Sequence, residues 1–452
     1  MPEREPSPTY KGMNLSGWGR FGRFDCRVLR AEKISQFENS IQNTVGETLI
    51  ARGYGRSYGD AAVNQAGVTL LTERLDRILA FDEDTGLLTA EPGVSLETLL
   101  SVFIPRGWMV PVVPGTKFVS LGGAVAADIH GKNHHREGSF SKHLRSFKLI
   151  DGQMQKHICS REENPDFFWA TVGGMGLTGL VSEVQLQLQR IPSSRIKMVA
   201  LPAKNLPELI EAFAEHEQKH HFSVAWLDCL AGGSSLGRGI LLLGDFAEEG
   251  DFRWNRKAPL SVPFQAPNFL LNHISMGLFN ELYYRLPRPE TQIVDADKFF
   301  FPLDRFSNWN YMYGPRGFIQ YQCLLPGPNA TKGLEQILKL CQSERMPSYF
   351  AVLKRFAKAE QHEHASLSFP DEGYTLAIDF PGSSRLADLC HKLDQIVIEH
   401  AGRIYLAKDS MMNPETFAQM YPQAQQWQEI CQRLASPKVF SSNLSRRLGL
   451  TD

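Results

Sequence analysis

The stretch Pro114–His135, PGTKFVSLGGAVAADIHGKNHH, decides how the rest of the chain is interpreted. A proline-glycine turn leads into the pair Gly122–Gly123, which lets a backbone approach a ligand closely. The small apolar run Ala124–Ala127 can begin a helix, and the first N–H groups of a helix attract anions. Titratable and cationic side chains follow at His130, Lys132, His134 and His135. We interpret the stretch as one side of a cofactor site.

A second glycine-rich loop, RGYGRSYGD at Arg52–Asp60, precedes this stretch. Its three glycines permit positive φ and expose successive N–H groups, a geometry that binds anions. It is not the dinucleotide fingerprint G-x-G-x-x-G, because the third glycine comes one residue late and no helical pattern separates the loop from Glu73. It also lacks the Gly-Lys-Ser/Thr ending of a Walker A loop. Alone, the loop could equally be a tight turn; together with Pro114–His130 it indicates a pyrophosphate held from two sides.

Length and composition limit the class of protein. At 452 residues the chain exceeds one compact core, so we expect two domains. The formal net charge of -1 gives no support for nucleic-acid binding, which favours a basic domain. No run approaches the ~18 consecutive apolar residues of a membrane-spanning helix, and the N-terminal segment lacks the apolar core of a secretory signal. We therefore expect a cytoplasmic protein, with at most peripheral contact at the inner face of the plasma membrane.

The cysteines are scattered singly along the chain. They stand at Cys26, Cys159, Cys229, Cys323, Cys341, Cys390 and Cys431. Because no two of them form a CxxC pair, we predict no zinc or other metal site. Their odd number and wide spacing favour reduced thiols in a cytosol-like compartment.

The hydrophobic pattern changes near Pro192. Before it, Ser95 is expected to cap a helix at 95–104, and Val184, Leu186 and Leu188 alternate with glutamines as in a half-buried strand. After it, expected strands at 222–230, 318–325, 349–356 and 374–380 alternate with expected helices at 206–219, 332–343 and 384–400. This pattern predicts a sheet backed by helices.

The segment Trp254–Asp295 has little regular pattern. It is apolar in patches and interrupted by prolines, which favours a mobile loop or lid over core structure.

Several motifs together resemble a known family. They are LSGWGRF at 15–21, the two stretches above, FFWATVGGMGLTG at 167–179, YGPRGFIQYQ at 313–322, GRIYLAKDS at 402–410 and FSSNLSRRLGL at 440–450. They resemble the PCMH-type FAD-binding domain of vanillyl-alcohol oxidase flavoproteins and, more closely, the decaprenylphosphoryl-ribose oxidases. The resemblance covers nearly the whole chain.

The resemblance implies an α+β fold of two domains. An FAD-binding domain would comprise residues 8–191 and the C-terminal segment 403–452. A substrate-binding domain, with an antiparallel sheet backed by helices, would comprise residues 192–402. This division agrees with the change of pattern near Pro192.

The resemblance also implies which residues hold FAD. They are Arg52, Gly53, Tyr54, Gly55, Arg56, Ser57, Tyr58, Gly59, Gly115, Ser120, Leu121, Gly122, Gly123, Ala127, Asp128, Ile129, Val181 and Tyr405. Some relatives tether FAD through a histidine at the position of Arg56. Because this loop contains neither His nor Cys, the resemblance implies non-covalent FAD.

The catalytic residues implied are Lys408 and His130. Lys408 matches the family's essential lysine, and either a neutral base or a charged group that stabilises an oxyanion would suit the oxidation of an alcohol. His130 would contact substrate or flavin, although a buried histidine is often structural. Lys132, Gln320, Gln322 and Lys354 are candidates for binding sugar hydroxyls and phosphate, and each could instead be structural.

The implied reaction is oxidation of the 2-hydroxyl of a polyprenylphosphoryl-pentose to a keto sugar. It would be the first half of an epimerisation that feeds cell-envelope arabinose synthesis. The expected partners are the lipid-linked sugar, a short-chain NAD(P)H-dependent keto-reductase, and a quinone or other electron acceptor. Two alternatives remain open: an oxidase of soluble alditols or aldonolactones, and a flavin-binding subunit without turnover of its own.

Overall fold

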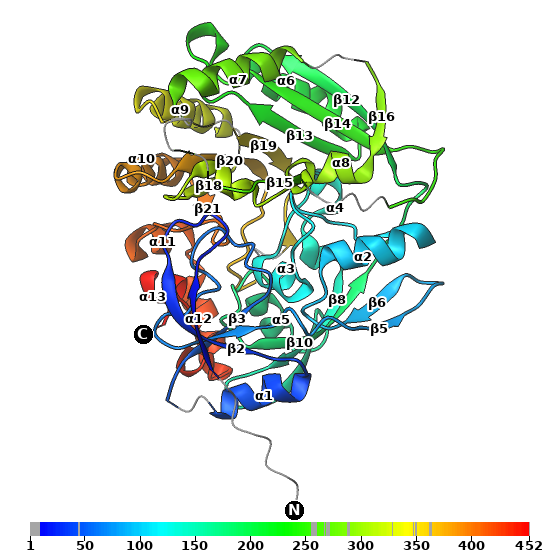
Figure 1. Cartoon of the computed structure of the whole chain (residues 1–452), viewed down its shortest axis with the longest axis vertical. Helices are drawn as coiled ribbons and strands as arrows, with labels where there is room; N and C mark the ends of the chain where they lie inside the picture. The colour runs from blue at the N-terminus through cyan, green and yellow to red at the C-terminus, as the bar shows by residue number, and fades with distance from the viewer. Residues whose placement is uncertain are drawn as a thin grey trace, which may run out of the picture.

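The computed structural model describes residues 10–43, 46–254, 260–265, 267, 272–286, 290–327, 329–346, 348, 350–360 and 364–451. Figure 1 shows two halves: the first 190 residues form the lower one, and the strands of residues 195–404 form the upper one. The last helices, drawn in red, lie against the lower half. The fold is therefore α+β, as the sequence predicts.

Two small sheets form the lower half. One has the strand order β1-β2-β4-β3, and its members are β1 (Lys11–Leu15), β2 (Phe24–Arg30), β3 (Leu49–Arg52) and β4 (Val68–Leu71). The other has the order β5-β6-β10-β8-β9, and its members are β5 (Ile78–Phe81), β6 (Leu87–Ala90), β8 (Leu144–Ile150), β9 (Lys156–Ser160) and β10 (Leu180–Gln187). In β10, residues alternate strictly between buried and half-buried, as the hydrophobic pattern predicts.

The lower half contains the helices α1 (Ile34–Asn43), α2 (Leu96–Phe103), α3 (Leu121–Ala127), α4 (His134–Glu137) and α5 (Pro165–Thr171). The Ser95 hydroxyl accepts a hydrogen bond from the Thr98 N–H, so Ser95 caps α2 as expected. Ser120 caps α3 in the same way, through the Gly123 N–H. The Gly122–Gly123 pair therefore lies in the first turn of α3, and the helix begins three residues before the predicted Ala124.

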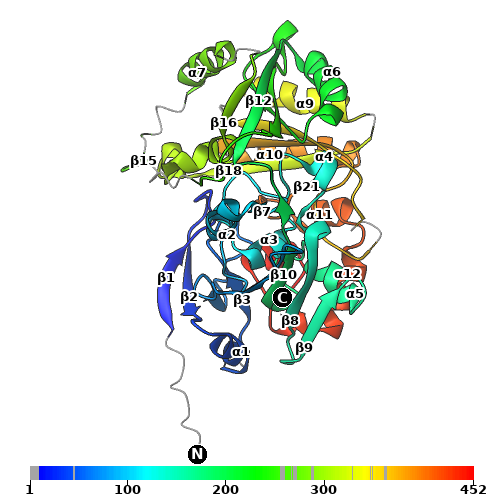
Figure 2. The ribbon, with the colours of Figure 1, turned by 90° about the vertical axis from the view of Figure 1, so that its right-hand side faces the viewer.

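One antiparallel sheet of eight strands forms the upper half. Its order is β16 (Gln292–Asp295), β12 (Arg195–Ala203), β14 (Gly239–Phe246), β13 (Phe222–Leu227), β19 (Ala351–Phe356), β20 (Gly373–Pro381), β18 (Phe318–Leu325) and β21 (Arg403–Ile404). The helices α6 (Leu206–His216), α9 (Ala330–Ser343) and α10 (Leu386–Glu399) contact this sheet. They lie on one side of it in Figure 2.

Two short strand pairs complete the sheets. They are β7 (Trp108–Met109) with β11 (Gln189–Arg190), and β15 (Leu260–Ser261) with β17 (Phe306–Ser307). The small helices are α8 (Ala296–Phe300), α11 (Pro414–Met420), α12 (Ala424–Arg433) and α13 (Asn443–Arg447). The domain boundaries 8–191, 192–402 and 403–452 stay a prediction. Residues 8 and 9 lie outside the described residues, and β21 still belongs to the upper sheet.

The prediction of a loop at Trp254–Asp295 is wrong for much of the segment. It contains β15, β16 and the helix α7 (His273–Arg285). Apolar residues occur on several sides of α7, so the sequence shows no clear helical period. Asn272 caps the helix by accepting hydrogen bonds from the N–H groups of Ile274 and Ser275. Residues 255–259, 266, 268–271 and 287–289 of this segment lie outside the described residues.

No helix in the described part of the chain has the length and the hydropathy that a membrane span requires.

All seven cysteines are buried as free thiols.

Arg447 fastens the C-terminal helix α13 to the lower half. Its guanidinium donates to the Asp60 carboxylate at 2.7 Å, to the Asp409 carboxylate at 2.8 Å and to the Met412 carbonyl at 2.7 Å. Asp60 belongs to the glycine-rich loop, and Asp409 follows Lys408. These two carboxylates raise the pKa of Arg447 above its ordinary value even though burial lowers it. One cation therefore joins three distant segments.

We expect Arg447→Met to lower the free energy of unfolding by about 3–5 kcal/mol, because two largely buried carboxylates lose their partner. Arg433→Met is a matched control on α12: Arg433 pairs with Asp166 at 2.9 Å, but both side chains are more than half exposed. Loss of that pair should cost less than about 1 kcal/mol. Equilibrium denaturation followed by tryptophan fluorescence measures both. Equal effects of the two substitutions would contradict the role given to Arg447.

Candidate active site

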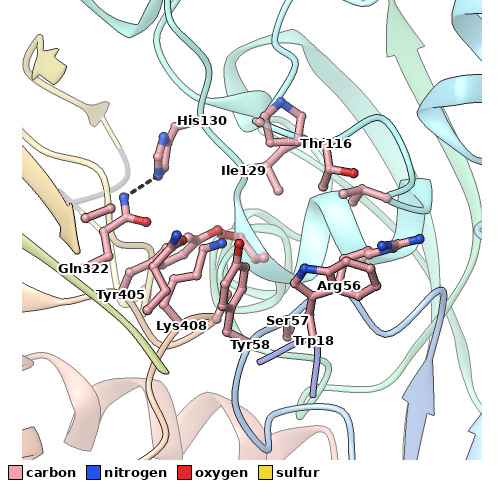
Figure 3. A pocket seen from close by; sticks show the side chains of 18 of the residues that line it. Trp18, Arg56, Ser57, Tyr58, Thr116, Ile129, His130, Gln322, Tyr405 and Lys408 are labelled. Atoms are coloured by element: carbon pink, nitrogen blue, oxygen red, sulfur yellow. Dashed lines mark hydrogen bonds between the residues drawn. The ribbon is translucent and has the colours of Figure 1, made fainter. Parts of the chain in front are cut away.

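A cavity of about 340 Å³ lies where the loops of the lower half meet the upper sheet. The sheet contributes side chains two residues apart on neighbouring strands, namely Gln320 and Gln322 of β18, Val352 and Lys354 of β19, and Thr375 and Ala377 of β20. Successive side chains of a strand point to opposite faces, so these six share the face turned away from α9 and α10. Figure 3 shows Gln322 opposite His130, and Lys408 beside Tyr58.

Most residues predicted for the site line this cavity. They are Gly53, Tyr54, Gly55, Arg56, Ser57, Tyr58, Gly115, Ser120, Gly122, Gly123, Ala127, Ile129, His130, Lys132, Val181, Gln320, Gln322, Lys354, Tyr405 and Lys408. They come from six separate regions of the sequence, and the fold brings them together. Their individual roles stay predictions.

Four predicted cofactor contacts lie outside the lining of the cavity. Arg52 donates hydrogen bonds to the carbonyl oxygens of Ser16, at 2.7 Å, and Ala62, at 3.1 Å. Gly59 packs so closely on the Asp409 carbonyl that a Cβ would clash with it. Arg52 and Gly59 therefore fix the conformation of the loop without lining the cavity.

The other two are Leu121 and Asp128, which are buried at the two ends of α3. Leu121 packs in the main hydrophobic core. The Asp128 carboxylate accepts hydrogen bonds from the Ser139 hydroxyl and the Ser141 N–H, both at 3.0 Å. The Ser368 hydroxyl, 240 residues further along the chain, also donates to this carboxylate. These contacts orient the α3 segment, and no local sequence pattern indicates them.

The glycine-rich loops fit an extended dinucleotide such as FAD. Gly53 and Ser120 approach so closely that a Cβ at Gly53 would clash with the Ser120 hydroxyl. A Cβ at Gly115 would meet no described atom within 4 Å, so its backbone borders open space. The Arg56 guanidinium lies over the Trp18 ring at 3.9 Å, and its Nε is buried without a hydrogen-bond partner among the described residues. Such backbone and cationic donors suit a phosphate-containing ligand.

Lys408 is a largely buried amine that lines this cavity. It follows β21, and its backbone N–H donates to the Tyr405 carbonyl at 2.9 Å. Its Nζ lies 3.6 Å from the centre of the Tyr58 ring. Burial lowers the pKa of Lys408 to about 7, and nearby Asp379 opposes this shift. Near neutral pH the amine can therefore exist with or without its proton.

Asp379, which the sequence analysis missed, lies behind this amine. Its carboxylate accepts hydrogen bonds from Gln320 at 2.7 Å and from the Tyr313 hydroxyl at 2.9 Å. Burial raises its pKa to about 7. The sequence does contain an indication of this role. In TLAIDF at 375–380, Asp379 lies on the same face of the strand as Thr375 and Ala377, and a buried carboxylate there requires a partner.

His130 is held as a neutral ring. Its Nε2 lies 3.0 Å from the Gln322 side-chain nitrogen, and its Nδ1 lies 3.4 Å from the Lys354 Nζ. Burial lowers its pKa well below the ordinary value, and Lys354 adds to this effect. A neutral imidazole accepts a hydrogen bond at one nitrogen and donates at the other. His130 therefore suits hydrogen bonding to a ligand better than it suits donating a proton.

Two further lysines make the cavity cationic. Burial lowers the pKa of Lys132 to about 7 and that of Lys354 to about 8. The Lys132 Nζ contacts the Phe299 carbonyl. An anionic ligand stabilises the charged form of such an amine and so raises the pKa that burial has lowered.

The remaining lining is largely apolar, and the sequence analysis did not assign it. It includes Trp18, Val224, Trp226, Leu242, Tyr283, Phe300, Leu303, Trp309, Phe350 and Val352. Period-two alternation in β13 could have identified Val224 and Trp226, whereas Tyr283 lies on α7, which the pattern does not reveal. The cavity thus joins a polar, cationic part to a wide apolar part.

Comparisons with known proteins agree with this geometry. Residues 27–160 match the model of a family described as an FAD binding domain. Over 451 aligned residues, the chain is 34% identical to the decaprenylphosphoryl-beta-D-ribose oxidase of Mycolicibacterium smegmatis, covering 96% of this chain and 97% of that one. It is 32% identical to an uncharacterised protein of Streptomyces coelicolor, over 79% of this chain and all of that one.

A more distant relative is the L-gulono-1,4-lactone dehydrogenase of Mycobacterium tuberculosis, 21% identical over 89% of this chain and 90% of that one. The level and the extent of identity are much higher for the ribose oxidase. The cofactor of this chain is FAD, and the chain belongs to the decaprenylphosphoryl-beta-D-ribose oxidase family of FAD-dependent oxidoreductases.

Proposed function

We propose that the protein oxidises the 2-hydroxyl of a polyprenylphosphoryl-pentose, resembling decaprenylphosphoryl-ribose, to the 2-keto sugar. The observation that supports this most is the largely buried Lys408, whose pKa burial lowers to about 7 in a cavity lined by both glycine-rich loops. Bound FAD supplies the group that accepts a hydride from the carbinol carbon. The protein's own task is then to remove the hydroxyl proton and to hold the sugar.

Lys408 is the proposed base. As the neutral amine it accepts the hydroxyl proton through Nζ, and the resulting ammonium is stabilised by the Tyr58 ring and by the Asp379 carboxylate. Burial raises the pKa of Tyr58 well above its ordinary value, so its hydroxyl stays protonated and does not compete as a base. The sequence left open whether Lys408 acts neutral or charged; its lowered pKa favours the neutral form.

The other polar residues are proposed to bind the sugar phosphate. Lys132 and Lys354 attract the anion, while His130, Gln320 and Gln322 offer hydrogen bonds to hydroxyl groups. The apolar lining around Trp226 and Leu242 suits the first units of a polyprenyl chain. The cofactor contacts proposed from the resemblance are those that line the cavity, with Arg52, Gly59, Leu121 and Asp128 supporting them from behind.

The proposed reaction needs partners. A keto product becomes an epimerised sugar only when a reductase returns a hydride to the other face, so a short-chain NAD(P)H-dependent keto-reductase should act next. A quinone or another acceptor should reoxidise FAD. Oxidation of soluble aldonolactones is not favoured, because the lactone dehydrogenase is the more distant relative. Turnover with polyprenylphosphoryl-ribose but not with free aldonolactones tests this choice, and the reverse preference would reject it.

Replacing Lys408 by Met should lower kcat by about 10²–10⁴, the usual contribution of a positioned base, while FAD content stays normal. Lys354→Met is the matched control, another largely buried lysine of the cavity. It should mainly raise KM, by about tenfold or more, because an anion contact is lost. Steady-state kinetics with measured FAD occupancy separates the two. Unchanged turnover in Lys408→Met would remove the base from the mechanism and revive the idea of a non-catalytic subunit.

The pH dependence follows from the neutral lysine. Because the base must be unprotonated, kcat/KM should fall as pH drops through about 7, the pKa of Lys408. Asp379→Asn removes a charge that raises this pKa, so the fall should move to lower pH. Asp394→Asn is the control: Asp394 is also buried and accepts a tyrosine hydrogen bond, from Tyr321 at 2.8 Å, but it does not act on Lys408. Loss of charge from Lys132 and Lys354 at high pH weakens substrate binding and so also lowers kcat/KM. A fall of kcat itself toward high pH, at saturating substrate, would mean that the charged Lys408 is the active form.

FAD should be bound non-covalently. Arg56 stands where some relatives tether the flavin, and a guanidinium is not a nucleophile at neutral pH. After acid precipitation the flavin absorbance should move wholly into the supernatant. Yellow colour that stays with the pellet would contradict this expectation.

A further inference from the structure

The helix α7 is held against the upper sheet by polar contacts on its inner side. Asn280 donates to the Asp228 carboxylate at 2.7 Å, and Arg238 pairs with Asp228 at 2.7 Å and with Glu281 at 2.8 Å. Met276 and Asn280 are almost completely buried. The helix is therefore fixed in one orientation about its axis.

The outer side of α7 presents a row of large apolar side chains. Ile274, Leu278, Leu282 and Leu286 follow one another at four-residue intervals and are 85%, 63%, 57% and 72% exposed. Residues four apart lie on one side of a helix. No described residue covers this row. An exposed apolar row of this kind marks a surface that contacts another apolar body.

The helix that carries this row also lines the cavity. Tyr283 of α7 lines the cavity, and its ring lies 4.8 Å from that of Trp226, which also lines it. Leu303, which also lines the cavity, lies shortly before β17, the partner of β15. Leu260 of β15 and nearby Phe264 are 68% and 69% exposed. Figure 2 shows α7 and β15 projecting from the same side of the molecule.

We propose that the outer side of α7 docks on the surface of a phospholipid bilayer and opens the cavity toward it. This inference rests on the proposed function, because the long polyprenyl chain of such a substrate stays in the bilayer. Each methylene withdrawn into water loses favourable transfer free energy, so a water-exposed path for the whole chain is prohibitive. An enzyme that takes the sugar phosphate must therefore meet its substrate at the membrane surface.

The structure favours a bilayer over a second copy of the chain. A protein seated on this row would extend over Tyr283 and close the cavity to a lipid. The docking should depend on apolar contact rather than on charge, since Arg285, the cation on this helix, already pairs with Glu281. Binding should accordingly change little with salt, which screens surface charges.

The test uses the full-length, FAD-loaded protein and sedimentation with phosphatidylcholine vesicles, with and without phosphatidylglycerol. The wild type should bind both at low and high salt. Leu278→Glu combined with Leu282→Glu should weaken binding by about tenfold or more. Leu79→Glu combined with Ile158→Glu is the matched control: these residues are 45% and 46% exposed on the edge strands β5 and β9, and binding should not change.

Activity distinguishes this proposal from the proposed function. The α7 variant should oxidise a short-chain, water-soluble prenylphosphoryl-ribose like the wild type, and lose activity only on the long-chain substrate held in vesicles. Vesicle binding without oxidation of either substrate would reject the function and leave the docking intact. Equal vesicle binding by wild type and α7 variant would overturn the docking, as would a wild-type dimer that the α7 substitutions dissociate without affecting vesicles.

Discussion

The burial of a single amine, that of Lys408, constrains much of this structure. A buried cation is costly unless other groups compensate for lost water, and here the Tyr58 ring and the Asp379 carboxylate do so. Tyr58 comes from the glycine-rich loop, Asp379 from the upper sheet and Lys408 from the segment after it. The amine is thus buried only when all three segments meet. The same three segments line or support the cavity. The site can therefore form only when the two halves of the molecule pack together.

The segment that contains Lys408 is fixed on both sides. The Tyr58 N–H donates to the Ala407 carbonyl at 2.9 Å, and Gly59 leaves space for the Asp409 carbonyl. Arg447 then joins Asp409 to Asp60 of the same loop. Lys408 therefore cannot move relative to the loop without breaking charged, largely buried contacts. Such positioning matters because a base acts only within hydrogen-bond distance of the proton it takes.

The sequence predicts those features that depend on neighbouring residues. The cap at Ser95, the alternation in β10 and the glycine-rich loops all follow from local pattern, and the resemblance adds Lys408. Features that depend on distant partners could not be predicted. The burial of Asp379 is explained by the hydrogen bonds that Tyr313 and Gln320 donate to it. In the sequence Arg52 resembles a ligand contact, but in the structure its guanidinium donates to the carbonyl oxygens of Ser16 and Ala62. The helix α7 was missed for a different reason: its orientation follows from Asp228 and Arg238, and its apolar residues lack the usual one-sided period.

The absence of a one-sided period in α7 has a physical meaning of its own. A leucine contributes to folding only when it is buried, and Leu278 and Leu282 bury little against the described part of the chain. Folding therefore does not explain why they are apolar, whereas Asn280 and Glu281 on the inner side are explained by Arg238 and Asp228. The cavity shows a matching division between three amines, those of Lys132, Lys354 and Lys408, and an apolar lining that includes Trp226 and Tyr283 of α7. A ligand with a charged head and an apolar chain satisfies both at once, because its head restores the charge of the buried lysines while its chain follows the apolar surface outward.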